Sequence, residues 1–232
     1  MENAFYGVER VVQRARRQAR AKRASLFRQY FAIGPTTRIL DIGSEDGSAI
    51  AAVLAGTGAD PANVFIADVD AQRVAEGARR YGFVPVTISE SGRLPFHDRF
   101  FDIVYCSSVI EHVTVAKSEV WSRRSGRDFR ATARQRQREF ADEIRRLGKS
   151  YYVQTPYKWF LIESHTWLPF VGFLPRRVQL PLIAMSNRYW IKRTAPDWCL
   201  LTARDMQRLF PDAMLKHERV LGFTKSIMAI RK

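Results

Sequence analysis

Glutamate and histidine side chains occur together in two short segments, a combination that proteins use to move protons and to hold metal ions. The first segment, "SSVIEHV", carries Glu111 and His112, and the second, "TPYKWFLIESHTWLPF", carries Glu163 and His165. His112 is the candidate general base, and Glu111 is the second candidate catalytic residue. The alternative is that His112 only braces the helix that follows it. Which of these holds depends on what the surrounding elements bind.

A glycine-punctuated turn in "RILDIGSEDGSAI" is the second feature that could hold a reactant. A hydrophobic strand at 38–42 runs through this turn into a helix, an arrangement by which many α/β proteins bind a cofactor. A dinucleotide-binding turn would have glycine where Glu45 and Ser48 stand, and a P-loop would have a lysine after Gly47. The two carboxylates in the turn would also repel a pyrophosphate. The turn therefore favours a cofactor that has no phosphate and carries a positive charge.

Short apolar runs alternate with helical segments through the middle of the chain, which predicts a parallel sheet buried on both faces. The predicted strands lie at 38–42, 63–68, 85–89, 101–107 and 150–155, and the predicted helices at 48–54 and 71–81. A long charged helix is predicted after the fourth strand, broken around 125–126 and strongest over 131–147. After a helix at 203–210, runs at 214–222 and 226–230 predict an antiparallel hairpin. Residues 156–198 are rich in aromatic residues and proline without a clear period, which suits a cap better than a sheet layer.

S-adenosylmethionine (SAM) meets the requirements of the turn, because it carries a sulfonium and no phosphate. Gly43 and Gly47 would let the backbone approach its methionine tail closely. Asp68, at the end of "VFIAD", would accept hydrogen bonds from both ribose hydroxyls, and Glu90 in "ISESGRLPF" would accept one from the adenine amino group. These positions follow strands of the predicted parallel sheet, where such sheets bind ligands.

Four segments in this order resemble the class I SAM-dependent methyltransferases, in the small-molecule branch typified by ubiquinone- and biotin-pathway enzymes. They are "ILDIGSEDG", "VFIADVDAQRV", "SESGRLPFHDRFFDIVYCSSVIEHV" and "EIRRLGKSYYVQTP", within residues 36–156. The resemblance implies an α/β, Rossmann-like sheet of seven strands with the last strand antiparallel, and SAM as the cofactor. The first loop of this family usually reads G-x-G-x-G, and Glu45 replaces the middle glycine here. A catalytically inactive SAM-binding module is therefore an alternative.

The resemblance and the residues above define a set of candidate site residues. The cofactor-binding candidates are Asp41, Gly43, Ser44, Gly47, Asp68, Val69, Glu90, Ser91 and Ser107, and the substrate-binding candidates are Tyr157, His165 and Trp167. Glu111, His112 and His165 also resemble part of the E-x-x-E-H metal motif, with a later histidine, of small-RNA 2′-O-methyltransferases. That motif needs a glutamate where this chain has Ser108. The sequence therefore predicts no metal.

Positive charge is concentrated in two stretches of the chain, whose formal net charge is +15. Residues 1–31 hold eight Lys or Arg against two acids, and residues 114–150 hold eleven against five. A thin apolar stripe within residues 8–31 predicts one long basic helix. We expect this helix to pack on the domain edge; a membrane-surface helix or a nucleic-acid arm is the alternative.

The sequence predicts one methyltransferase domain over residues 1–232: a basic helix at 1–33, a SAM-binding core at 34–155, a substrate cap at 156–200 and a C-terminal helix and hairpin at 201–232. The expected reaction is O-methylation of a small molecule or of a lipid- or glycan-linked acceptor. The aromatic cap supports this expectation, because it resembles a bacterial subgroup associated with cell-surface polysaccharide and lipid-linked pathways. Methylation of nucleic acid, RNA in particular, is the alternative.

The expected location of the protein is the cytoplasm. No stretch of the sequence approaches the roughly 18–20 apolar residues of a membrane span, and the first residues have no apolar leader. The basic helix makes the inner face of an anionic membrane a candidate contact.

Overall fold

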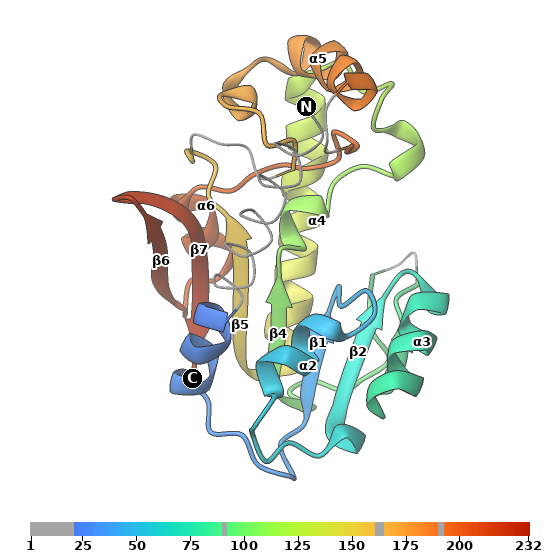
Figure 1. The fold of residues 1–232 in the computed structure, drawn as a ribbon, viewed down its shortest axis with the longest axis vertical. Coiled ribbons are helices and arrows are strands. Elements are labelled where there is room, and N and C mark those ends of the chain that lie inside the picture. The colour runs from blue at the N-terminus through green and yellow to red at the C-terminus, as the bar shows by residue number, and fades with distance from the viewer. Residues whose placement is uncertain (1–20, 90–91, 161–164, 190–192) are drawn as a thin grey trace, which may run out of the picture.

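The computed structural model describes residues 21–89, 92–160, 165–189 and 193–232. Its centre is a seven-stranded sheet with the order β3-β2-β1-β4-β5-β7-β6 (Figure 1). The strands are β1 (Ile39–Ile42), β2 (Val64–Asp68), β3 (Val84–Thr87), β4 (Phe101–Ser107), β5 (Gly148–Pro156), β6 (Met214–Val220) and β7 (Phe223–Arg231). Strands β1 to β5 are parallel, and β7 is antiparallel to both β5 and β6. This confirms the predicted Rossmann-like sheet with an antiparallel last strand.

Helices cover both faces of the sheet (Figure 1). They are a helix at 21–30, α2 (Ser48–Leu54), α3 (Ala71–Tyr81), α4 (Gly126–Leu147) and α6 (Ala203–Leu209), whereas α5 (Arg176–Tyr189) lies beyond the carboxyl ends of the strands. The helix at 21–30 packs with α2 and α3 on one face, where Phe27, Ile50 and Val74 share a buried cluster. Ile144 of α4 and Met206 of α6 belong to a second cluster. Because both faces are covered, the central strands are apolar along most of their length.

The parallel register brings the cofactor turn and the candidate catalytic segment to the same edge of the sheet. Asp41 in β1 lies beside Tyr105 in β4, so the chain leaves both strands side by side at their carboxyl ends. The described residues between β5 and α6 lie beyond this edge, where α5 covers the N-terminal end of α4 (Figure 1). The turn, the catalytic segment and the cap therefore share one end of the sheet.

One helix begins where the sequence predicts a break, and another is not predicted. Helix α4 begins at Gly126, because the hydroxyl of Ser125 accepts a hydrogen bond from the amide of Asp128 and caps the helix. The sequence predicts no helix within residues 156–198, yet α5 forms there. Pro181 lies inside α5, and proline in a helix interior removes a hydrogen bond and weakens the sequence signal.

The described part of the basic helix packs against the sheet rather than standing apart from it. Phe27 is fully buried and contacts the rings of Tyr105 and Tyr152 edge to face, at centroid distances of 5.3 and 5.5 Å. Arg23 donates a hydrogen bond to Gln154 at the end of β5. Residues 1–20 lie outside the described residues. In the part of the chain that is described, no helix has both the length and the apolar character that a membrane crossing requires.

Candidate active site

Three residues in left-handed backbone conformations bend the turn after β1. Gly43, Glu45 and Gly47 have φ angles of 78°, 53° and 70°. The amides of Gly43 and Ser44 both donate to the carbonyl oxygen of Ala67 in β2, at 2.7 and 3.2 Å. Glu45 stands where related loops usually have glycine, and it adopts a conformation that glycine reaches more easily. The turn therefore keeps a glycine-like shape despite the substitution.

Gly43 also brings the turn against the segment that carries the catalytic candidates. A Cβ atom at position 43 would lie 2.5 Å from both γ-carbons of Val109, closer than packed atoms approach. The missing side chain of Gly43 therefore lets the turn and the chain just before Glu111 touch.

Asp68 lies against the turn, where the sequence predicts a ribose-binding carboxylate. Its Oδ2 accepts a hydrogen bond from the amide of Glu45 at 2.9 Å, and its Oδ1 accepts one from the amide of Asp70 at 3.2 Å. Val69 beside it is 64% exposed, which leaves an apolar surface next to the carboxylate. Two further cofactor candidates, Glu90 and Ser91, lie outside the described residues.

Asp41 is a buried carboxylate with an unsatisfied oxygen. The residue is 3% exposed, and its Oδ2 has no hydrogen-bond partner among the described residues. Burial, and secondly the negative charge of Asp68, raises the pKa of Asp41 well above its ordinary value of 3.8. A nearby cation would stabilise the ionised form. Asp41 therefore fits a cofactor that carries positive charge.

We expect Asp41→Asn to raise the free energy of unfolding of the cofactor-free protein by about 1 kcal/mol or more at neutral pH, since an amide has no pKa difference between folded and unfolded states and each unit of such a difference is worth about 1.4 kcal/mol. Because the pKa of Asp41 is raised in the folded protein, the native state keeps this proton to a higher pH than the unfolded chain does. The destabilisation by the carboxyl is therefore absent below the pKa of Asp41 in the unfolded chain. It grows as the pH rises toward the pKa of Asp41 in the folded protein and is constant above it. Thermal unfolding at several pH values should show a gain that vanishes in acid. A gain of the same size at every pH would contradict this account.

The two serine candidates have different surroundings. Ser44 is buried, and its Oγ has no hydrogen-bond partner among the described residues. Ser107 Oγ donates to Gln154 Oε1 at 2.7 Å. Ser108 Oγ and Arg23 donate to the same oxygen at 3.2 and 2.8 Å. The hydroxyl of Ser107 is thus engaged in joining β4 to β5, so Ser44 is the stronger candidate for cofactor contact.

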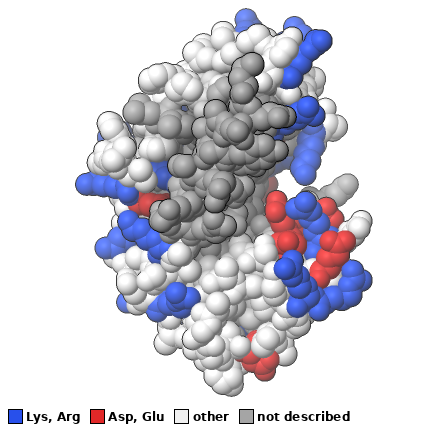
Figure 2. All heavy atoms as spheres, in the orientation of Figure 1, with Lys and Arg blue, Asp and Glu red and all other residues white. Residues whose placement is uncertain are grey.

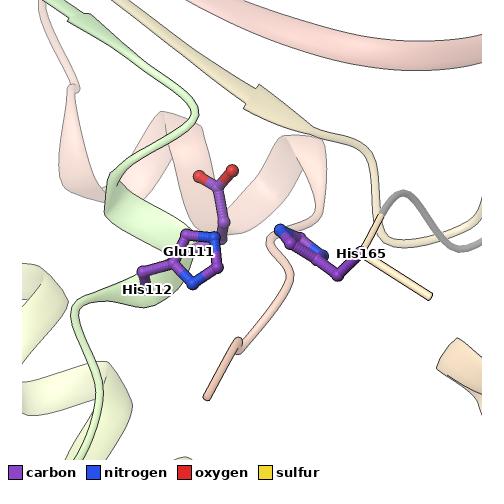
Figure 3. A group of neighbouring side chains, drawn as sticks. All are labelled: Glu111, His112 and His165. Atoms are coloured by element: carbon purple, nitrogen blue, oxygen red, sulfur yellow. The ribbon is translucent and has the colours of Figure 1, made fainter. Parts of the chain in front are cut away.

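Glu111, His112 and His165 converge at the carboxyl end of the sheet, and their side chains point toward one another (Figure 3). Glu111 and His112 lie in the short turn after β4, and His165 belongs to the cap. One potential ligand atom of each residue lies within 4.8 Å of the other two. The imidazole rings meet nearly at a right angle, with centroids 4.6 Å apart. The structure thus brings His165 next to the catalytic candidates Glu111 and His112, as their residue types suggest in the sequence.

Asp197 completes this group, although no motif in the sequence indicates it. Its Oδ1 lies 3.0 Å from Nδ1 of His112, 85 positions away in the chain. Burial raises the pKa of Asp197, but the hydrogen bond from His112 and the charges of His112 and His165 more than offset burial, and the pKa lies below its ordinary value. The ionised Asp197 can only accept a hydrogen bond, so it keeps a proton on Nδ1 of His112, and when the ring is neutral its lone pair is on Nε2.

Glu111 is fully buried beside the two imidazoles. Its Oε2 accepts a hydrogen bond from Thr155 Oγ1 at 2.9 Å, whereas its Oε1 has no partner among the described residues. Burial raises the pKa of Glu111, and the charges of both histidines act in the opposite direction. Its unsatisfied oxygen could receive a proton or bind a cation.

The three substrate candidates lie in different places. The ring of His165 stacks on Trp198, with centroids 4.9 Å apart. Tyr157 forms an isolated β-bridge with Leu201. Trp167 is half-buried in the cap and has a φ of 61°. His165 is thus the substrate candidate that the structure places beside the catalytic candidates Glu111 and His112.

Residues 40–124 match the family model of the methyltransferase domain, Methyltransf_11. No curated protein matches the chain. Among solved structures, the magnesium protoporphyrin IX methyltransferase of Synechocystis PCC 6803 with bound SAH is similar over 97% of this chain and 87% of that chain, with 12% identity and a TM-score of 0.53. A chain of the complex between the Haloferax volcanii Trm112 methyltransferase activator and a methyltransferase is similar over 90% and 87%, with 13% identity and a TM-score of 0.52.

A third similar structure, from Rhodobacter sphaeroides, is named for Zn-dependent alcohol dehydrogenases. It is similar over 89% of this chain and 87% of that chain, with 10% identity and a TM-score of 0.57. At such identities the structural likeness shows the fold alone.

The sheet order and the glycine turn define the class I methyltransferase fold. Together with the match of residues 40–124 to the methyltransferase domain, they indicate a SAM-dependent methyltransferase, for which SAM is the cofactor. The residues present fit that cofactor: the turn has left-handed glycines, Asp68 lies beside it, and Asp41 has a buried oxygen without a partner among the described residues.

Proposed function

We propose that the protein transfers the methyl group of SAM to a hydroxyl oxygen of a small molecule or of a lipid- or glycan-linked acceptor. The observation that carries this proposal is the cluster of Glu111, His112 and His165 with Asp197 behind it. A hydroxyl becomes a good nucleophile when its proton is removed, and a positioned histidine or carboxylate commonly removes it. The cofactor supplies an electrophilic methyl group, so the protein has to position and activate the acceptor.

His112 is suited to activate the acceptor. Asp197 fixes the proton on Nδ1 of His112, so Nε2 presents a lone pair, and the negative charge of Asp197 stabilises the ring when it becomes positive. Val109, which packs on the cofactor turn, lies just before Glu111 in the chain. The activating groups are therefore adjacent to the place where the methyl donor is expected.

A cavity of about 500 Å³, lined by none of the four residues of this cluster but by their neighbour Trp198, supports an anionic acceptor. Trp198 stacks on the ring of His165. Among the described residues, its lining includes one acid, Asp205, and several exposed or half-buried cations, which are Arg127, Arg130, Arg134, Lys158 and Arg177. Asp205 is already bonded to Thr202 in a helix cap. The cavity therefore has excess positive charge.

The shape of the lining indicates what the anion would be attached to. Arg127, Arg130 and Arg134 are three and four positions apart on α4, so they project from one face of the helix. Trp159 and Phe173 line the same cavity, are 51% and 42% exposed, and have ring centroids 5.6 Å apart. Exposed aromatic surface beside positive charge suits a phosphate or carboxylate joined to an apolar or sugar portion. This supports a lipid- or glycan-linked acceptor.

Arg130→Gln and Arg134→Gln, made singly, are each expected to raise the KM for such an acceptor about threefold to tenfold, with little change in kcat, because each removes binding that is equal in the ground and transition states. Arg138→Gln is the matched control, since Arg138 is exposed on the same helix but is not part of the cavity lining. Steady-state kinetics at saturating SAM measure the effect. A fall in kcat at constant KM, or the same change in the control, would argue against an acceptor site here.

Nucleic acid is the alternative acceptor, because the chain is strongly basic. On the face shown in Figure 2, however, the Lys and Arg side chains do not form one continuous stripe. Over α3 they are mixed with acids, and Arg73 pairs there with Glu45 at 3.2 Å. A nucleic-acid site would present a more continuous positive surface.

Labelled SAM and a cell extract divided into lipid, glycan and RNA fractions test the proposal. Label in the lipid or glycan fraction, recovered as a methyl ether, would support it, whereas a methyl ester would indicate a carboxylate acceptor and contradict it. Label in RNA, with binding that weakens steeply as salt is added, would favour the nucleic-acid alternative. SAM binding without transfer to any fraction would favour an inactive binding module.

A further inference from the structure

We propose that Glu111, His112 and His165 form a binding site for one divalent transition-metal cation such as Zn²⁺. Their potential ligand atoms lie within 4.8 Å of one another. A cation about 2.0–2.2 Å from each atom needs ligand separations of roughly 3–4 Å, so an adjustment of about an ångström closes the site. Two imidazoles and one carboxylate are typical ligands of first-row transition metals, whereas Mg²⁺ and Ca²⁺ prefer oxygen ligands.

A second observation, independent of the spacing, also indicates a ligand at this cluster. Glu111 is 0% exposed, and its Oε1 has no hydrogen-bond partner among the described residues. Buried polar oxygens in proteins nearly always have a partner. Figure 3 shows the side chain of Glu111 between the two imidazole rings, and one potential ligand atom of each residue lies within 4.8 Å of the other two. A cation there would satisfy this oxygen and bind both histidines.

The groups around the three residues are those that usually orient metal ligands. Asp197 lies 3.0 Å from Nδ1 of His112, which turns Nε2 into the donor atom, as in carboxylate–histidine–metal arrangements. Thr155 holds the other oxygen of Glu111 at 2.9 Å. Trp198 stacks on the ring of His165 and restricts its rotation. Each of the three proposed ligands is therefore oriented by a neighbouring side chain.

The sequence predicts no metal because Ser108 stands where a second glutamate of the E-x-x-E-H motif would be. Three ligands suffice for a catalytic metal site, which keeps a further position for water or substrate. Metal binding itself does not depend on the proposed reaction. Its use does rest on the proposed function, because a bound cation would lower the pKa of an acceptor hydroxyl, and His112 would then act as a ligand rather than as a base.

Titration of the full chain, prepared without a histidine tag, tests the site in the absence of SAM and acceptor. We expect Zn²⁺ to bind in about one equivalent with micromolar or tighter affinity, and Co²⁺ to give visible absorption bands that Zn²⁺ removes. An excess of Mg²⁺ should not displace either ion. Absence of saturable Zn²⁺ binding would overturn the proposal.

The four histidines of the chain supply a matched pair of double variants. His112→Ala with His165→Ala should weaken Zn²⁺ binding about a hundredfold or more, whereas His97→Ala with His217→Ala should not change it. Glu111→Gln preserves the side-chain shape and should weaken binding at least about tenfold. Circular dichroism and SAM affinity establish that each variant is folded. Equal loss in both histidine pairs would contradict the assignment.

Asp197→Asn separates positioning from ligation. It leaves all three ligands in place and should weaken Zn²⁺ binding about tenfold, the usual effect of removing a carboxylate behind a ligating histidine. The metal site and the proposed reaction can also fail separately. If the protein binds Zn²⁺ but methylates no fraction, the metal site is upheld and the proposed reaction is rejected. If it transfers methyl groups to oxygen but binds no metal, the reaction is upheld and the metal site is rejected.

Discussion

His112→Ala is expected to lower kcat for methyl transfer about a hundredfold or more, the usual contribution of a positioned proton-transfer group. Because Asp197 lies at Nδ1, Nε2 of His112 is the atom expected to take the acceptor proton, or to hold the proposed metal that activates the hydroxyl. The affinity for SAM should change by no more than about twofold, because a group that acts mainly in the transition state contributes to kcat and little to cofactor binding. Initial rates at saturating SAM, with the extract fraction that the unmodified protein labels, measure the loss.

Two further variants make this result specific. His97→Ala is the control, because His97 is exposed and its ring lies against Phe100, away from the catalytic group. It should leave the rate unchanged. Asp197→Asn should lower the rate less than His112→Ala does. Without the anion the imidazolium is less stable, so the acid limb of the rate profile should move to lower pH. A rate near that of the unmodified protein for His112→Ala would remove this residue from the reaction.

Asp68→Ala is expected to weaken SAM binding more than about tenfold, which corresponds to about 1.4 kcal/mol or more of binding free energy. Two losses combine in this variant. The carboxylate predicted to accept from the ribose hydroxyls is removed, and the amide of Glu45 loses the oxygen that it donates to at 2.9 Å. Asp68→Asn keeps an oxygen for the Glu45 amide and should have an intermediate affinity. Titration calorimetry with SAM compares the three proteins.

Asp70→Ala is the matched control for Asp68. The side chain of Asp70 caps α3 by accepting a hydrogen bond from the amide of Arg73. Its removal should lower the free energy of unfolding by about 1 kcal/mol, the typical value of a helix cap, and leave the affinity for SAM unchanged. Equal SAM affinity for Asp68→Ala and the unmodified protein would reject the role assigned to Asp68.

The elements around the cofactor turn were predictable because their signals are local. The predicted helices at 48–54 and 71–81 coincide with α2 and α3, and α3 is bounded by a capping aspartate, Asp70, and a left-handed glycine, Gly82. Once the strands are known to be parallel, their carboxyl ends must meet at one edge. The proximity of Asp68 to the turn follows from this rule.

The partners of the catalytic group were not predictable, because they depend on contacts between distant parts of the chain. Asp197 meets His112 across 85 positions, and Thr155 meets Glu111 across 44. Neither partner lies in a motif whose spacing could indicate the contact. The fully buried position of Glu111 is likewise a product of packing, since a glutamate in a turn after a strand is ordinarily exposed.

The contact between Gly43 and Val109 limits how this enzyme can be altered. A Cβ at Gly43 would lie 2.5 Å from the γ-carbons of Val109. A bulkier residue at either position would therefore push the cofactor turn away from the segment that carries Glu111 and His112. Directed evolution toward new acceptors should therefore find tolerated changes in the cap and along the exposed arginines of α4. The junction at Val109 should stay nearly invariant in such libraries, whatever acceptor is selected.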